Sequence, residues 1–140
     1  MGALLDAQAL VAFFRDEPGA QDVEIVLRRG DATMTAPNLS ETLDVLTRVD
    51  RYEEDLLRSL IEPLGVEIVP MTGYHAWRAA SLRARHYVKD GSEVSLPDCV
   101  LVAVATAVDV VVTADRPVLR MAEAEGIATL ALPDSSGQRW

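Results

Sequence analysis

Residues 108–127, VDVVVTADRPVLRMAEAEGI, contain the pattern that decides the fold. The β-branched run at residues 110–113 is typical of a buried strand. Asp115 follows this run, and residues 116–125 then form an expected helix that Gly126 closes. A strand that turns at an acidic residue into a helix is the repeating unit of an α/β fold.

The same alternation of short apolar runs and helical segments extends along the whole chain. We expect strands at residues 3–5, 32–35, 66–69, 110–113 and 127–130. We expect helices at residues 7–15, 20–29, 38–49, 52–62, 74–89, 97–107 and 116–125. Strands that alternate with helices predict a parallel sheet with right-handed crossovers and helices on both faces, an α/β three-layer sandwich.

The length of 140 residues predicts a single domain. We place that domain at residues 1–132 and expect residues 133–140 to be a loose C-terminal tail. No apolar run approaches the roughly 18 residues that a membrane span needs. The N-terminus lacks the basic lead of a signal peptide, so we expect a cytoplasmic protein without membrane contact. The net charge of −9 is opposite to that of most nucleic-acid-binding proteins.

Four acidic residues lie where an expected strand ends or an expected helix begins: Asp6, Glu41, Asp98 and Asp115. Ligands of parallel sheets bind beyond the carboxyl ends of the strands, where the strand order reverses. We therefore expect these four side chains to meet at one edge of the sheet. Carboxylates that converge without a lysine or histidine between them need a cation, and an all-oxygen site favours Mg²⁺ or Mn²⁺.

Helix capping is an alternative explanation for each acid. Asp6 and Asp115 are suitable N-cap residues, and an acid in the first turn gains from the helix dipole. The other two acids resemble capping boxes, because each lies three residues after a capping residue: Glu41 after Asn38, and Asp98 after Ser95. The two explanations are compatible, since a cap also fixes the direction of a ligand.

Four motifs taken in order resemble the PIN-domain nucleases, and most closely the VapC-type toxins of toxin–antitoxin pairs. They are LLDAQALVAFF at residues 4–14, NLSETL at 38–43, LPDCVLVAVA at 96–105, and the segment 108–127. The resemblance covers nearly the whole chain. The spacing of the four acids and the Thr-Ala-Asp after the fourth expected strand are its most specific parts.

The resemblance implies a sheet in the order 3-2-1-4-5 and catalytic, metal-binding roles for Asp6, Glu41, Asp98 and Asp115. It implies that Thr113 supports the metal site with its hydroxyl group. It further implies a metal-dependent endoribonuclease that is the toxin of a toxin–antitoxin pair, blocked by a small antitoxin protein and forming a homodimer.

The expected helix at residues 74–89 offers candidate contacts to RNA. At 100° per residue, Arg78, Arg85 and Lys89 fall in one stripe, which could bind phosphates or pair with neighbouring acids. The opposite side is apolar, and we expect the helix to bury it: Trp77, Ala80, Ala84, Tyr87 and Val88. His75 and His86 also lie on this helix, away from the acidic motifs, so we do not expect histidine-based catalysis.

Two other functional classes stay open. A phosphoacceptor receiver or an aspartate-nucleophile phosphatase also uses acids on an α/β sheet. Both need a lysine in the site, and the single lysine, Lys89, is in the wrong segment. A non-catalytic PIN-like interaction module predicts that acids of the set would be missing, and none is.

Overall fold

Five parallel strands form one sheet in the order β3-β2-β1-β4-β5, as expected. The computed structural model describes residues 2–140. The strands are β1 (Ala3–Leu5), β2 (Ala32–Thr35), β3 (Glu67–Val69), β4 (Val110–Thr113) and β5 (Ala128–Ala131). The α-helices are α1 (Ala7–Phe14), α2 (Ala20–Arg29), α3 (Ala36–Asp44), α4 (Glu54–Ile61), α5 (Gly73–His86), α6 (Leu96–Val104) and α7 (Arg116–Ala124).

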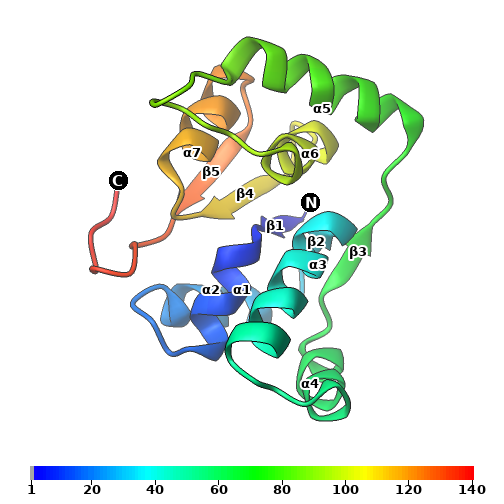
Figure 1. Ribbon diagram of the computed structural model, residues 1–140, viewed down its shortest axis with the longest axis vertical. Helices are drawn as coiled ribbons and strands as arrows, with labels where there is room; N and C mark the ends of the chain where they lie inside the picture. The colour runs from blue at the N-terminus through cyan, green and yellow to red at the C-terminus, as the bar shows by residue number, and fades with distance from the viewer. Residues whose placement is uncertain (1) are drawn as a thin grey trace.

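The two faces of the sheet pack against different helices (Figure 1). Because consecutive side chains of a strand point to opposite faces, Leu4 and Val111 join the core beneath α5, α6 and α7. Their neighbours Leu5 and Val112 join the core beneath α1 and α2. Helix α6 is buried almost all round, from Cys99 to Val104. The three-layer architecture is therefore confirmed.

Helix α3 crosses the carboxyl end of the sheet, where it contacts α1, α6 and β2. The expected single helix at residues 38–49 is divided here, because a π-helical turn, Val45–Val49, follows α3. A short 3-10 turn, Glu62–Leu64, likewise ends α4. The position of α3 matters because it brings its first two turns close to the start of α1.

The prediction for the buried side of α5 was wrong. Trp77 is 82% exposed, and Ala80 and Ala84 are exposed as well. The helix packs on α6 through Ala79 and Leu82 instead. These two residues lie roughly opposite Trp77 on a helix. The small side chain of Ala79 allows α5 to approach α6 closely, and the helix therefore buries this face instead of the one that carries Trp77.

The C-terminal residues 133–140 contain no helix or strand, and Arg139 joins them to the domain. The Asp134 carboxylate accepts hydrogen bonds from the backbone N–H groups of Ser136 (2.9 Å) and Gln138 (3.0 Å). The Arg139 guanidinium donates to the carbonyl oxygen of Ala131 (2.8 Å) and to the Asp22 carboxylate (2.9 Å). No helix in the described part of the chain is long and apolar enough to cross a bilayer.

Candidate active site

Asp6 lies at the carboxyl end of β1, in the middle of the sheet, and is only 4% exposed. It is the N-cap of α1, as expected, and its Oδ1 accepts a hydrogen bond from the Ala9 N–H (2.8 Å). Its Oδ2 accepts a hydrogen bond from the Thr113 hydroxyl. Burial raises the pKa of Asp6 from 3.8 to about 7, and the charges of Asp98 and Asp115 act in the same direction.

Thr113 and Asp115 reach Asp6 because β4 is the neighbour of β1. The register pairs Leu5 with Val112, so Asp6 and Thr113 follow side by side at the carboxyl edge. The Thr113 hydroxyl also accepts a hydrogen bond from the Asp115 N–H (3.0 Å). Asp115 is the N-cap of α7, and partial burial together with the Asp98 charge raises its pKa.

Asp98 comes from the first turn of α6, where the expected capping box is confirmed. The Asp98 carboxylate accepts from the Ser95 N–H (3.1 Å), and the Asp98 N–H donates to the Ser95 hydroxyl (3.2 Å). One carboxylate oxygen, Oδ2, makes the cap, which leaves lone pairs free for a ligand.

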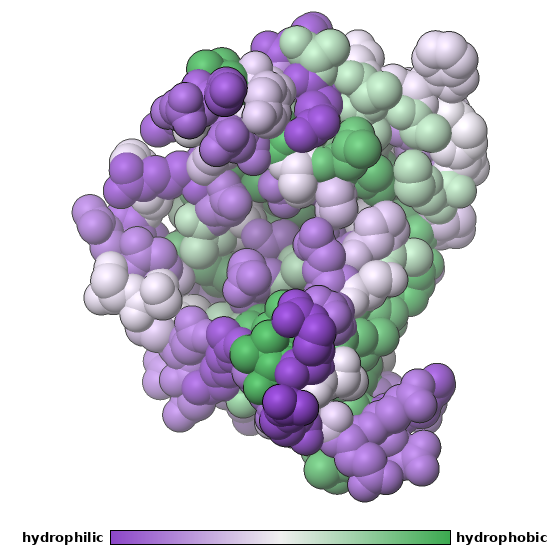
Figure 2. Space-filling view, viewed as in Figure 1, coloured by the Kyte–Doolittle hydropathy of each residue, from purple (hydrophilic) through white to green (hydrophobic). Residues whose placement is uncertain are grey.

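Asp98 lies within electrostatic reach of all three other acids. Its charge contributes to the raised pKa of Asp6, of Asp115 and of Glu41, whose pKa is raised first by burial. Glu41 projects from α3, which packs against α6. The four acids thus border one region between α1 and α3 on one side and α6 and α7 on the other, and Figure 2 shows hydrophilic surface around a recess there.

The expected capping box at Glu41 was wrong by one turn. Thr35 is the N-cap of α3, and its hydroxyl accepts from the Asn38 N–H (3.2 Å). Glu41 is therefore in the second turn of the helix and makes no cap. The capping explanation fails for this acid alone.

Asn38 is a buried polar residue that the sequence analysis treated only as a cap. It is 1% exposed, and neither its Nδ2 nor its Oδ1 has a hydrogen-bond partner among the described residues. It lies one turn before Thr42, whose hydroxyl donates to the carbonyl oxygen of Ala7 (3.1 Å), directly after Asp6. A buried amide without partners is costly unless water or a ligand meets it.

A divalent cation fits this edge of the sheet by donor chemistry. The acids supply only oxygen ligands, as Mg²⁺ prefers. In residues 2–140, no three acidic, histidine or cysteine side chains are already gathered at ligand distance. Asp6 is held by two hydrogen bonds, whereas Glu41 and Asp115 are exposed enough to change rotamer. We therefore expect binding to draw the outer acids toward Asp6.

Thr113→Val is expected to destabilise the protein and to raise the pKa of Asp6 further. The substitution removes a donor from the Asp6 carboxylate and an acceptor from the Asp115 N–H, and an unsatisfied buried group costs about 1–3 kcal/mol. Chemical denaturation checks the stability. Thr113→Ser keeps the hydroxyl and should remain close to the parent, so equal losses in both variants would contradict this role.

The expected basic stripe of Arg78, Arg85 and Lys89 is shorter than predicted, because α5 does not reach Lys89. The helix ends at His86, so Lys89 lies in the turn beyond it. Arg85 makes two hydrogen bonds to the Glu125 carboxylate (3.0 and 3.3 Å), and His86 is 3.0 Å from the same carboxylate. Pairing with a neighbouring acid therefore describes Arg85, while contact of Arg78 with RNA stays a prediction.

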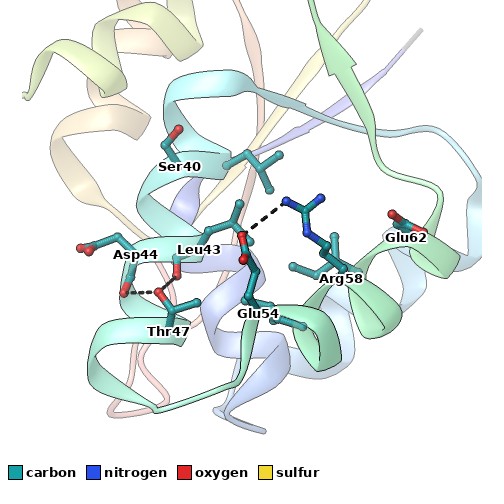
Figure 3. Close-up of a pocket in the computed structure, with 10 residues that line it drawn as sticks. Ser40, Leu43, Asp44, Thr47, Glu54, Arg58 and Glu62 are labelled. Carbon is teal, nitrogen blue, oxygen red and sulfur yellow. Dashed lines mark hydrogen bonds and ion pairs between the residues drawn. The ribbon is translucent and has the colours of Figure 1, made fainter.

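A pocket of about 500 Å³ lies between α3 and α4, outside the four acids. Figure 3 shows Arg58 pointing toward Glu54, one turn earlier on α4, while Asp44 lies on the α3 side of the pocket. Leucines and an isoleucine line the pocket together with three acids, two of which pair with arginines, Asp44 with Arg48 and Glu54 with Arg58. This arrangement suits a protein segment better than the chemistry of phosphodiester cleavage.

In a comparison with known families, residues 3–124 match the PIN domain. A search of curated proteins finds no relative. The matched range includes all four acids and Thr113, and PIN domains are generally metal-dependent nucleases. The sheet order and the matched range agree, and the chain belongs to the PIN-domain family.

Proposed function

We propose that this chain is a Mg²⁺- or Mn²⁺-dependent endoribonuclease that hydrolyses phosphodiester bonds of RNA. The observation that carries the proposal is the placement of Asp6 and Asp115 just beyond the carboxyl ends of the neighbouring strands β1 and β4, with Asp98 in the first turn of α6, so that the three carboxylates repel one another. Mutual repulsion of this kind is relieved by a cation that also attracts phosphate.

Each residue of the site has a proposed part in the reaction. Asp6 is the fixed ligand, because Thr113 and the Ala9 N–H hold its carboxylate in one orientation. Asp98 and Asp115 complete the ligand set from helix starts, and Glu41 orients water from α3. A bound cation would make water more acidic and offset the charge that develops on the phosphate. Cleavage should leave a 5′-phosphate and a 3′-hydroxyl.

We further propose that the protein is the toxin of a cytoplasmic toxin–antitoxin pair. The apolar lining of the pocket between α3 and α4, with Glu62 among its lining residues, suits an amphipathic antitoxin segment that carries basic residues. The exposed apolar side chains of α5, which include Tyr74 and Trp77, support a homodimer through this helix. A short reading frame next to this gene that encodes a protein able to inhibit the nuclease would support the assignment.

Incubation of the purified protein with labelled RNA tests the proposed activity. We expect internal cleavage with Mg²⁺ or Mn²⁺ and none with a chelator. Asp98→Asn should lose activity, whereas Asp44→Asn, which alters an exposed acid of the pocket, should retain it. Absence of cleavage with either ion, or undiminished cleavage by Asp98→Asn, would contradict the proposal.

A further inference from the structure

The C-terminal segment places an aromatic ring against the start of α7. The guanidinium carbon of Arg116 lies 3.1 Å from the centroid of the Trp140 ring, so the two groups are stacked. Arg116 is the residue after Asp115, and the C-terminal segment ends near the start of α7 (Figure 1). Trp140 remains 53% exposed although Arg116 covers one side of its ring.

Arg116 and Arg120 belong to the half of the arginines that make no ion pair with a carboxylate among the described residues. Six arginines make ion pairs with carboxylates: Arg15, Arg28, Arg48, Arg58, Arg85 and Arg139. Within residues 2–140, Arg116 and Arg120 make none. They are one turn apart on α7 and border a hollow of about 240 Å³ together with Trp140 and Glu123.

Asp134, in the C-terminal segment, interacts with Arg116 through charge alone. The charge of Arg116 helps to lower the pKa of Asp134, but hydrogen bonds from Ser136 and Gln138 act on that carboxylate first. The stacked ring covers a face of the Arg116 guanidinium, and its N–H groups project from the edge of that plane. Arg120, the edge of the Arg116 guanidinium and the indole ring therefore face one hollow, which Glu123 also borders.

We propose that Trp140 is a stacking platform for an unpaired base of single-stranded RNA, with Arg116 supporting the ring and Arg120 contacting a phosphate. This inference rests on the proposed nuclease function, since it places a nucleotide next to the cleavage site. Unpaired bases stack on aromatic side chains in most single-stranded nucleic-acid sites.

Tryptophan fluorescence tests the platform directly, because the chain contains only two tryptophans. The protein would carry Asp6→Asn to prevent cleavage and Trp77→Phe to leave Trp140 as the reporter. Titration with a short, fluorescein-labelled, single-stranded oligoribonucleotide of mixed sequence should quench Trp140, with anisotropy measured in parallel. The matched protein with Trp140→Phe and Trp77 retained is the control, and quenching of Trp77 equal to that of Trp140 would contradict the platform.

Single substitutions distinguish the contribution of base stacking to RNA affinity from the contribution of charge. Trp140→Ala should weaken binding by about fivefold or more. Arg120→Gln should reduce the slope of log affinity against log salt by about 0.7, the value for one phosphate contact with a single strand. Arg29→Gln, at an exposed arginine on α2, should change neither quantity.

The outcomes distinguish this inference from the proposed function. Binding that leaves Trp140 fluorescence unchanged, or that Trp140→Ala does not weaken, overturns the platform even if the parent cleaves RNA. Quenching without cleavage by the parent supports the platform and contradicts the nuclease. Absence of oligonucleotide binding in both readouts overturns the platform.

Discussion

Asp6→Asn is expected to abolish RNA cleavage and yet to stabilise the metal-free protein at pH 8. The loss of activity should be at least about a hundredfold, because the substitution removes the fixed charge of the site. The gain in stability follows from burial, which raises the pKa of Asp6 to about 7. Above that pH the folded protein must hold a buried carboxylate that the unfolded chain exposes to water.

The pH dependence gives the sign of this effect. Between about pH 4 and pH 7, Asp6 is protonated in the folded protein and ionised in the unfolded chain. The folded state then binds more protons, so stability falls as the pH rises through this window. The shift corresponds to about 4 kcal/mol as an upper value. Asp6→Asn should flatten the fall between pH 5 and pH 7, as measured by thermal denaturation in a chelator.

Asp109→Asn is a matched control with the opposite sign. Burial acts to raise the pKa of Asp109, but hydrogen bonds from Thr106 and Gly2 outweigh it, and the pKa is lowered. The ionised side chain therefore stabilises the folded protein, and its substitution should lower the melting temperature at pH 8. If Asp6→Asn lowered the melting temperature as Asp109→Asn is expected to do, the ionised Asp6 carboxylate would not destabilise the folded protein.

Addition of Mn²⁺ is expected to raise the melting temperature of the parent protein at pH 8. A ligand at 100 times its dissociation constant stabilises by about 2.7 kcal/mol, which is roughly 5–10 °C for a domain of this size. The cation relieves repulsion between Asp98, Asp115 and Asp6. The rise should be smaller at pH 6, where Asp6 holds its proton.

Single substitutions show which acids contribute to this effect. Asp98→Asn and Asp115→Asn should each reduce the Mn²⁺-induced rise, whereas Asp44→Asn, at an exposed acid paired with Arg48, should leave it unchanged. An equal rise in all three variants would place the cation elsewhere on this acidic protein. The measurement is thermal denaturation in matched buffers with and without Mn²⁺.

The parts of the fold that could be predicted are those with strong local patterns. The β-branched run before Asp115 and the capping serine before Asp98 specify a strand end and a helix start without tertiary information. The parallel topology then follows from the alternation of elements. This is why the positions of Asp6, Asp98 and Thr113 at the carboxyl edge could be expected before the structure.

The sequence-based predictions were wrong where packing between distant segments decided which of several locally possible arrangements forms. The sequence of α5 offers two apolar sides, and contact with α6 selected the one with Ala79 and Leu82, which left Trp77 exposed. The contacts of Arg139 and Trp140 join residues far apart in the chain, so no local pattern indicates them. The burial of Asn38 likewise depends on where α3 crosses the sheet.

The central claim is that the four acids share one cation, and anomalous diffraction from crystals soaked in Mn²⁺ tests it most directly. The account predicts a peak at the carboxyl ends of β1 and β4, with oxygens of Asp6 and of Asp98 or Asp115 at about 2.1–2.3 Å. A Mn²⁺ peak bound only by other acids, or no peak at this edge in crystals with ordered Asp6 and Asp98, would contradict it.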